Sequence, residues 1–501
     1  MEEIRSLSNG YIAAVLVIVF ITGFQYLQAR RHDIKVPAVG CSGFFSSYVA
    51  AFRWISHAKA ILEEGYVKHK HGIFKVSQPD RWQVIITGPK LIEEVRRAPS
   101  NKLSLKAGLD ESLAMGYTMG QELIDNSYHV AIIRTQLTRN LSSVFPQVRN
   151  EIVHSFQDLI PLTDDWVGYP AVETFMTIVA RTSNRIFVGL PTCRDPDYIK
   201  LNIEYTVQVF KAATLIGLTP SFLRPIVGRL LSPARSGVRR GLKHLRPIIE
   251  ERLRKYEEYG LNYPDKPNDM LTWMMDEAEG NERGVEILCL RMLSVNMTAL
   301  HTSSMSLAQA MFHLASKPQY IEPMRVEVER VIQEDGWTKE AMTKMRKVDS
   351  FLKETQRVNG LSFLSTLRLA VDDYTFSDGT FIPKGTLMSV ASAATHNDPE
   401  LYENANEFQG FRFADLREDG VGDVKHQMVS TSPEYLPFGH GSYACPGRFF
   451  AANELKAMMA HIVLNYDVKM EPDGVRPQDI HFTLHCAPNL TAKILFRKRQ
   501  Q

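Results

Sequence analysis

The sequence has few cysteines and no close pair of them. Its 501 residues contain five cysteines, at positions 41, 193, 289, 445 and 486, and no two of them are separated by only two residues. An odd, scattered set of this kind argues against a disulfide framework and against a cysteine-rich zinc site. It favours a reducing compartment for the folded part of the chain.

The chain also lacks a strong net charge and a nucleotide-binding loop. The formal net charge is only +2, so nothing in the charge balance indicates a nucleic-acid partner. No Gly-x-Gly-x-x-Gly follows a strand-like segment, and no flavin-binding region or internal repeat is present. The sequence therefore gives no sign that the chain binds a nucleotide or flavin cofactor of its own. The hydrophobic content of 44% supports a sizeable core.

One long apolar run lies at the N-terminus, over residues 10–27, with no charged residue between Arg5 and Arg30. Its length suits a marginal transmembrane helix. A cleaved signal peptide is the alternative, but two glutamates precede the run and no small-x-small cleavage site follows it. Basic residues follow it instead, which by the positive-inside rule retains them in the cytosol. We predict a single-pass anchor over 1–30, a linker over 31–43 and one domain over 44–501.

The remainder reads as mainly helical with small β-sheets, an α+β class. Helical periodicity dominates from residue 128 to about 350. Residues 98–127, rich in glycine, are predicted to be a long irregular loop. Alternating patterns predict a hairpin over 74–87, a helix over 90–97, short strands after 363, and closing strands over 466–469 and 490–496.

The longest predicted helix covers residues 285–316 and is apolar on almost every face, which places it at the centre of a large domain. Its middle, residues 298–304, reads Thr-Ala-Leu-His-Thr-Ser-Ser. Alone, these hydroxyls can bond back to their own helix, and the histidine can be a satisfied core residue. Beside a cofactor, a hydroxyl can open a pocket, and a hydroxyl with an ionisable neighbour can relay protons.

Two further stretches carry charge. Glu354 and Arg357 share one helix face, and taken alone they read as an exposed ion pair of little energetic value. Residues 235–254 are strongly basic. A solvated helix face is the simpler interpretation of that stretch, and a docking surface for an acidic partner or anionic lipid is the alternative.

The stretch 438–451 reads Phe-Gly-His-Gly-Ser-Tyr-Ala-Cys-Pro-Gly-Arg-Phe-Phe-Ala. A lone cysteine is most often a buried structural thiol. Here, however, Cys445 lies in a tight glycine-rich loop that opens onto a predicted helix. The amides at a helix start favour a thiolate, and the glycines at 439, 441 and 447 let the backbone approach a flat object closely.

The pattern Phe-x-x-Gly-x-x-x-Cys-x-Gly resembles the haem-thiolate loop of the cytochrome P-450 superfamily. Together with the polar helix at 298–303, the Glu354/Arg357 pair and the segment 408–413, it extends the resemblance over essentially the whole chain after the anchor. Within the superfamily, the sequence resembles fungal microsomal members of secondary metabolism. The resemblance implies the P-450 fold, with haem between the long central helix and the cysteine-loop helix.

The resemblance also implies roles for individual residues. Cys445 would be the axial thiolate ligand of the iron of haem b, favouring O–O cleavage. Phe438 would lie beside the haem. Glu354, Arg357 and Arg412 would form a buried charge triad that holds the cysteine loop. Haem-propionate contacts are implied for Arg368, Arg134, Tyr443 and, more weakly, His129. Thr302, with His301, matches the oxygen-activation position.

Three residues depart from the family pattern. Tyr443 stands where arginine or histidine is usual, so one cationic propionate contact is lost. His301 replaces an acid, so histidine or water must relay protons. Gly410 stands where proline is common, and little effect is expected.

The implied activity is monooxygenation of a bulky apolar substrate, with a terpenoid favoured, using O2 and electrons from NADPH. NADPH–cytochrome reductase would be the partner, with cytochrome b5 as a second donor, at the endoplasmic reticulum membrane. Arg448 and Lys456 are candidate docking residues. The predicted pocket is lined by Met115, Met119, Ala299, Leu361, Phe363, Leu364, Leu367 and Leu484.

Two other functions remain open. The same fold can serve an isomerase or dehydratase that does not use O2, although such members typically lose the central threonine and distort the cysteine loop. Alternatively, the chain is a non-catalytic, membrane-anchored binding protein in which Cys445 is structural, which predicts no haem.

Overall fold

The computed structural model describes Gly23 and residues 34–40, 46–78, 81–418, 424–471 and 474–500. Apart from Gly23, the predicted anchor over 1–30 lies outside the described residues, as does most of the linker. Within the described ranges, no helix is long and apolar enough to cross a membrane. Contacts divide the chain into two compact units. Unit 1 comprises residues 1–118, 210–232 and 367–391, and unit 2 comprises 119–209, 233–366 and 392–501.

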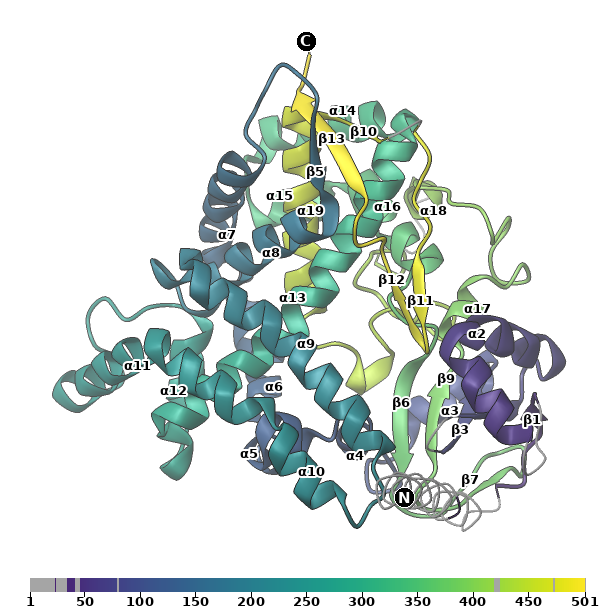
Figure 1. Cartoon of the computed structure of the whole chain (residues 1–501). Helices are drawn as coiled ribbons and strands as arrows, with labels where there is room; N and C mark the ends of the chain where they lie inside the picture. The colour runs from purple at the N-terminus through teal and green to yellow at the C-terminus, as the bar shows by residue number, and fades with distance from the viewer. Residues whose placement is uncertain are drawn as a thin grey trace, which may run out of the picture. The chain divides into compact units, whose positions relative to one another are not determined.

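Unit 1 is built on a six-stranded mixed sheet in the order β1-β2-β3-β9-β6-β4 (Figure 1). Strands β2 and β3 are antiparallel, which confirms the predicted hairpin, and β9 pairs with β3 in parallel. The strands are β1 (Ala38–Val39), β2 (Ile73–Ser77), β3 (Trp82–Ile86), β4 (Leu103–Ser104), β6 (Ser365–Ala370) and β9 (Leu387–Val390), with a separate hairpin of β7 (Tyr374–Thr375) and β8 (Phe381–Ile382).

The helices of unit 1 are α2 (Ser46–Lys68), α3 (Pro89–Arg97), α4 (Leu105–Leu113) and α10 (Arg224–Leu231). Helix α3 confirms the prediction for 90–97. It begins at a proline, whose fixed φ suits a first helical position.

The prediction of an irregular loop over 98–127 is wrong. Residues 105–125 are largely helical, as α4, the π-helix η1 (Gly116–Gly120) and α5 (Gln121–Asp125). Gly108 lies inside α4, where an added Cβ would come within 3.2 Å of the backbone nitrogen of Leu369. This glycine therefore serves a close approach between a helix and a strand, not a turn.

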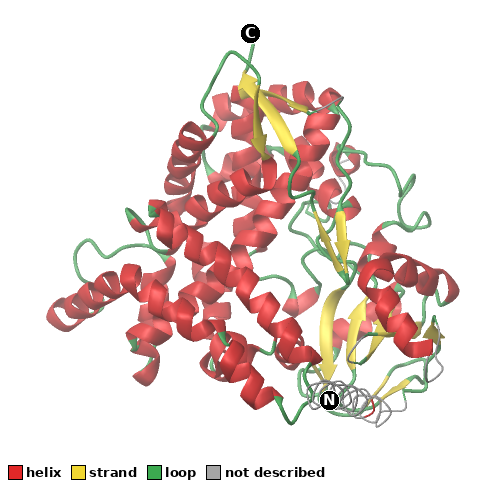
Figure 2. Ribbon diagram, viewed as in Figure 1, coloured by secondary structure: helices red, strands yellow, loops and turns green. Residues whose placement is uncertain are grey.

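Unit 2 is predominantly helical, and Figure 2 shows its strands as short segments among the helices. The central helix α13 (Val285–Ser316) has the predicted bounds and packs against α8, α11, α16 and α19. The helices are α5, α6 (Tyr128–Ile132), η2 (Ile133–Leu137), α7 (Thr138–Leu159), α8 (Ala171–Phe187), most of α9 (Pro196–Leu218), α11 (Pro233–Tyr259), α12 (Met270–Glu277), α13, α14 (Ile321–Asp335), α15 (Lys339–Lys344), α16 (Arg346–Val358), α17 (Ser392–His396), α18 (Arg412–Glu418) and α19 (Arg448–Asn465).

Two small antiparallel sheets complete unit 2. Strand β13 (Lys493–Lys498) pairs with β10 (Tyr466–Met470) on one side and β5 (Val167–Pro170) on the other. The predicted closing strands are thus confirmed. Strands β11 (Ile480–Phe482) and β12 (His485–Ala487) form a hairpin in which His481 lies opposite Cys486.

Candidate active site

The cysteine loop closes on itself before α19 begins. The amide of Cys445 donates to the carbonyl of Phe438 at 2.8 Å, and a short 3-10 turn over Gly441–Tyr443 lies between them. Gly439 and Gly441 have φ angles of 68° and 74°, in the left-handed region that glycine adopts without strain. The two glycines therefore let the backbone reverse direction immediately before the cysteine.

The Cys445 sulfur has the surroundings of a metal ligand. Burial raises the pKa of the thiol, while the amides of Gly447 and Arg448 donate to the sulfur and the Arg448 guanidinium opposes the rise. A thiolate at this position would be stabilised by these two amides and by the Arg448 charge, and a bound metal ion would add a further positive charge. The donor set around this sulfur therefore fits haem iron.

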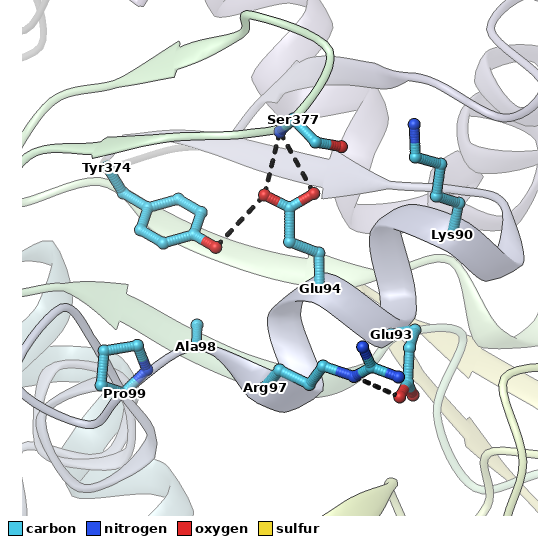
Figure 3. Close-up of a pocket in the computed structure, with 8 residues that line it drawn as sticks. All are labelled: Lys90, Glu93, Glu94, Arg97, Ala98, Pro99, Tyr374 and Ser377. Atoms are coloured by element: carbon cyan, nitrogen blue, oxygen red, sulfur yellow. Dashed lines mark hydrogen bonds and ion pairs between the residues drawn. The ribbon is translucent and has the colours of Figure 1, made fainter.

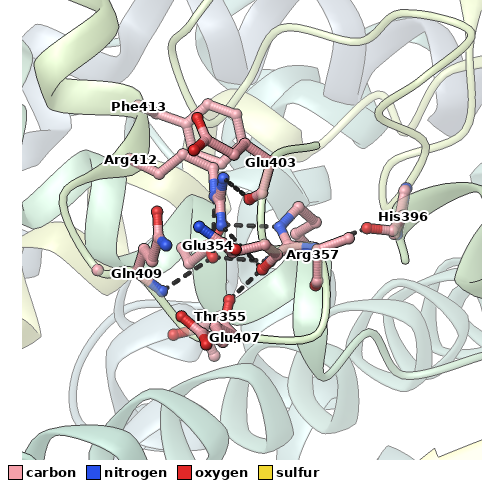
Figure 4. Close-up of polar contacts among 12 residues, drawn as sticks. Glu354, Thr355, Arg357, His396, Glu403, Glu407, Gln409, Arg412 and Phe413 are labelled. Atoms are coloured by element: carbon pink, nitrogen blue, oxygen red, sulfur yellow. Dashed lines mark hydrogen bonds and ion pairs between the residues drawn. The ribbon is translucent and has the colours of Figure 1, made fainter. Parts of the chain in front are cut away.

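Glu354, Arg357 and Arg412 meet in one buried network (Figure 4). Arg357 forms two parallel bonds to the Glu354 carboxylate, each 2.8 Å, and both side chains are 0% exposed. Arg412 Nε approaches Glu354 Oε1 at 3.2 Å. The pair is completely enclosed, as the implied buried triad requires, and it is not the exposed ion pair that the two residues suggest when taken alone.

His396 links this network to the cysteine loop, and sequence reasoning missed it. Arg357 Nη1 donates to the His396 carbonyl at 2.6 Å, and the backbone amide of Leu436 donates to His396 Nε2 at 2.9 Å. Burial, followed by the nearby Arg357 charge, lowers the pKa of His396 to about 3, so the ring is neutral and accepts that bond. Leu436 lies two residues before Phe438, so the triad is tied to the start of the loop.

A second buried charge cluster lies beside the first. Asp349 accepts from Arg417 Nη2 at 2.5 Å and from Lys456 Nζ at 3.1 Å. Lys456 is only 7% exposed. The prediction that Lys456 is a docking residue is therefore wrong, because its ammonium group is buried and paired with Asp349. Arg448 is half-buried and donates to the carbonyls of Cys445 and Val429.

The burial of helix α13 changes near its middle. The helix is largely buried, yet Thr298 and Thr302, one turn apart, are exposed, and Ala299 between them is half-exposed. Thr302 Oγ1 donates to the Thr298 carbonyl at 2.9 Å. This one face of a core helix therefore opens onto accessible space and presents hydroxyl groups to it.

His301 faces another helix. Its Nε2 lies 3.1 Å from the Ile203 carbonyl in α9, an acceptor, so Nε2 carries the hydrogen. Burial lowers the pKa of His301, and that bond partly opposes the shift. The ring is therefore neutral at pH 7, with Nδ1 as its remaining acceptor, and it ties α13 to α9.

Of the residues with implied propionate contacts, Arg134, Tyr443 and His129 belong to unit 2 and Arg368 to unit 1. Arg134, in the π-helix η2, donates to the Ser442 carbonyl at 3.0 Å and so lies beside the cysteine loop, which also contains the half-buried Tyr443. His129 Nδ1 accepts from Arg291 Nη1 at 3.0 Å, and burial together with that charge lowers its pKa to about 4. Arg368 is 1% exposed and belongs to unit 1.

Two of the predicted pocket segments lie side by side in unit 2. The Phe363 amide donates to the Leu484 carbonyl at 2.9 Å, and the Cys486 amide donates to the Leu361 carbonyl at 3.0 Å. Phe363, Leu364 and Met119 are buried, whereas Leu361, Leu484 and Ala299 are half-exposed. Met115 and Leu367 belong to unit 1.

Unit 1 contains a separate surface hollow of about 450 Å³ (Figure 3). Its lining is charged: Glu94 accepts from the Ser377 amide at 2.9 Å and from the Tyr374 hydroxyl at 3.3 Å, and Lys90 and Arg97 lie around it. Such a lining does not match the apolar pocket expected for a bulky apolar substrate.

Helix α19, which follows the cysteine loop, also holds a buried acid, Glu454. Its Oε1 accepts from the Ser183 hydroxyl at 2.9 Å, and burial raises the pKa of Glu454 from 4.5 to about 8. The unfolded chain ionises this group near pH 4.5 but the folded chain keeps the proton. The stability that Glu454 contributes is thus fully present below pH 4.5 and is lost as the pH rises from 4.5 to 8.

Replacing Glu454 with glutamine should therefore stabilise the protein at neutral pH by up to roughly 3 kcal/mol, at about 1.4 kcal/mol per pKa unit. Thermal unfolding of the haem-loaded protein at pH 5 and pH 8 measures this. The variant should gain most at pH 8, whereas Glu257→Gln on the exposed surface of α11 should behave like the wild type at both. An equal shift of Glu454→Gln at the two pH values would contradict the buried acid.

The sulfur of Cys445 accepts hydrogen bonds from two backbone amides, and a buried Glu–Arg–Arg network is tied to the start of its loop. In a predominantly helical fold, these features are those of a haem-thiolate enzyme. The family model for cytochrome P450 matches residues 50–496. The chain belongs to the cytochrome P450 family, and it is similar to cytochrome P450 monooxygenases of fungi.

Two relatives and one solved structure illustrate how far the similarity extends. The chain is 45% identical to Cytochrome P450 monooxygenase 151 of Postia placenta, over 93% of this chain and 94% of that protein. It is 37% identical to Cytochrome P450 monooxygenase CYP512U6 of Ganoderma lucidum, over 95% and 93%. A solved structure of retinoic acid-bound cyanobacterial CYP120A1 has a TM-score of 0.68 at 18% identity, covering 93% of this chain and 99% of that one, and shares the fold.

Proposed function

We propose that this P450 is a membrane-anchored enzyme that hydroxylates, or further oxidises, a bulky apolar substrate with O2. The electrons come from NADPH through NADPH–cytochrome reductase, with cytochrome b5 as a second donor. The cofactor is haem b, and the substrate class is terpenoid, within fungal secondary metabolism.

The observation that carries this proposal is the exposed hydroxyl face of α13. Thr298 and Thr302 are accessible in a helix that is otherwise largely buried, which is where a monooxygenase needs room for substrate and hydroxyl groups for proton transfer. An isomerase or dehydratase does not need these hydroxyls, and a binding protein does not need the amide-surrounded sulfur of Cys445.

The residues divide the work as follows. Haem, when bound through Cys445, supplies the oxygen chemistry. Thr302 holds a proton at Oγ1 and, through its bond to the Thr298 carbonyl, keeps that hydroxyl on the exposed face. His301, held as the Nε2–H tautomer by Ile203, positions α9 across α13. Leu361, Phe363 and Leu484 exclude water with apolar surface.

The experiment is oxygen consumption by the full chain with reductase and NADPH, compared with product formed. Thr302→Ala should still consume oxygen but lower the yield of product per oxygen several-fold, because proton transfer is no longer placed at Oγ1. Thr302→Ser should restore the yield.

Thr177→Ala is the matched control, because its hydroxyl makes the same kind of bond, to the Glu173 carbonyl of its own helix at 3.2 Å. It should leave the yield unchanged. Unchanged coupling in Thr302→Ala would count against the role of Thr302, and absence of any reductase-dependent oxygen use would count against monooxygenation.

The proposed location is the endoplasmic reticulum membrane, through residues 1–30. Exposed apolar side chains on unit 1 support contact with lipid: Phe222, Ile226 and Leu230 are 54%, 60% and 79% exposed. The full chain should sediment with membranes after an alkaline carbonate wash. A full chain released by that wash would contradict the anchor.

The basic helix α11 offers part of a surface for the reductase. Arg240 is paired with Asp197 and Glu204, and Arg252 with Asp269. Exposed cations remain on this helix at Arg235, Arg239 and Lys243. These three lie on one face at four-residue spacing, which suits an acidic partner.

A further inference from the structure

The hairpin of β11 and β12 brings three different metal-ligand side chains together. A ligand atom from each of Asp479, His481 and Cys486 lies within 4.8 Å of the other two. His481 and Cys486 are directly opposite in the antiparallel register, and Asp479 immediately precedes β11. The absence of a CxxC pair excludes a cysteine-rich zinc site but not a mixed site of this kind.

The spacing suits zinc. Cys486 Sγ lies 3.7 Å from Asp479 Oδ2. With Zn–S of about 2.3 Å and Zn–O of about 2.0 Å at a tetrahedral angle, sulfur and oxygen should be about 3.5 Å apart. The pair is therefore already at its ligand separation. The ligand atoms of the three residues are at most 4.8 Å apart, so the widest separation has to shorten by about 1 Å for zinc to bind all three. The exposed side chain of His481 can move by that distance.

The Asp479 carboxylate is held in place by two neutral donors from elements outside the hairpin and by an ion pair with Arg476. Asn359 Nδ2 donates to Asp479 Oδ2 at 2.5 Å, and Gln309 Nε2 donates to Oδ1 at 3.0 Å. Arg476 also approaches Oδ1, at 2.9 Å. Carboxylates that ligate metals are typically fixed by such outer hydrogen bonds. The positive charge of Arg476 is on the oxygen away from the thiol.

We propose that Asp479, His481 and Cys486 bind one zinc ion, with water in the fourth position. Thiolate, imidazole and carboxylate are all normal zinc ligands, and the buried thiol excludes the harder Mg²⁺ and Ca²⁺. When zinc binds, the Cys486 thiol loses its proton to solvent. The hydrogen bond from this thiol to Asp479 Oδ2 is then replaced by one bond from zinc to the sulfur and one from zinc to the carboxylate oxygen.

The site has a consequence for the neighbouring pocket segment. The hairpin turn carries Leu484, whose carbonyl accepts from the Phe363 amide, and the His481 ring packs edge-on against Phe363 with 5.1 Å between centroids. Zinc bound at the hairpin would fix both strands and hold Leu484 against residues 361–363. Zinc binding itself does not depend on the proposed substrate or reaction.

The test is zinc binding by the haem-loaded full chain after removal of divalent metals. Zinc chloride is titrated against a chromophoric chelator, and bound zinc is counted by emission spectroscopy after dialysis. The wild type should retain one equivalent, and His481→Ala and Cys486→Ser should each weaken it by at least about tenfold. Haem content should be unchanged in both variants.

Controls separate this site from scattered surface binding. His154→Ala removes a half-buried histidine outside the hairpin and Cys193→Ala another buried cysteine, and both should keep the tight equivalent. The proposal is overturned if the wild type retains no zinc, or if His481→Ala binds as tightly as the wild type. Because His481 is exposed, His481→Ala decides the question even if Cys486→Ser fails to fold.

Discussion

Replacing Arg357 with alanine is expected to abolish haem incorporation and to remove most of the stability of the fold. The guanidinium bonds the Glu354 carboxylate twice and also donates to the carbonyls of His396, Ala405 and Glu407. Removing it takes both short bonds from a buried carboxylate, which keeps only the longer contact with Arg412 as an ion pair, and it takes the guanidinium donor from three carbonyl oxygens. Breaking a buried pair in this way costs about 3–5 kcal/mol.

The loss should reach the cysteine loop, because His396 is the residue that joins Arg357 to Leu436. Haem content, measured against protein concentration, and thermal unfolding test this. Arg357→Lys should have a haem content and a thermal stability between those of the wild type and Arg357→Ala, because lysine keeps the charge but cannot form the planar two-bond contact.

Arg330→Ala is the matched control on another helix. Its ion-pair partner is Glu334, 3.0 Å away, and the two side chains are 57% and 50% exposed. Such a pair is worth about 0–1 kcal/mol, so haem content should not change. An Arg357→Ala protein that loads haem and unfolds like the wild type would show that the triad does not support the loop.

Cys445→Ser is expected to eliminate the red-shifted thiolate band in the carbon-monoxide difference spectrum of the reduced protein and to abolish oxidation of substrate. Serine keeps the size of the side chain but is a weak ligand for a soft metal site. The backbone bond from Cys445 to Phe438 does not involve the side chain, so the loop should keep its form.

Cys289→Ser serves as the control for this substitution. Cys289 is 0% exposed and its sulfur donates weakly to the Val238 carbonyl at 3.8 Å. A serine hydroxyl can make the same bond, so the band should be retained. A Cys445→Ser protein with the wild-type band would remove the basis for the haem-thiolate assignment.

The local elements of this fold were predictable from the sequence. The bounds of α13 and the β2–β3 hairpin follow from hydrophobic periodicity, which needs only neighbouring residues. The loop over 98–127 was predicted wrongly, because glycine marks both turns and close packing. Gly108 has to be small because β6 passes over α4, and that approach depends on residues about 260 positions away.

The candidate site divides in the same way. Cys445 was marked by its own neighbours in the chain, and Glu354 with Arg357 by their spacing on one helix. Lys456 was misjudged as a docking residue because a lysine is normally exposed, and only the fold places Asp349 beside it.

The sequence alone determined the class of protein, the candidate ligand cysteine and the long central helix, since each is encoded within a short stretch of chain. Only the tertiary structure decided which charges are buried, that His396 joins the triad to the loop, that His301 faces α9, and that Asp479, His481 and Cys486 meet. The physical reason is that burial and pairing depend on which distant segments come together, and no local pattern records that.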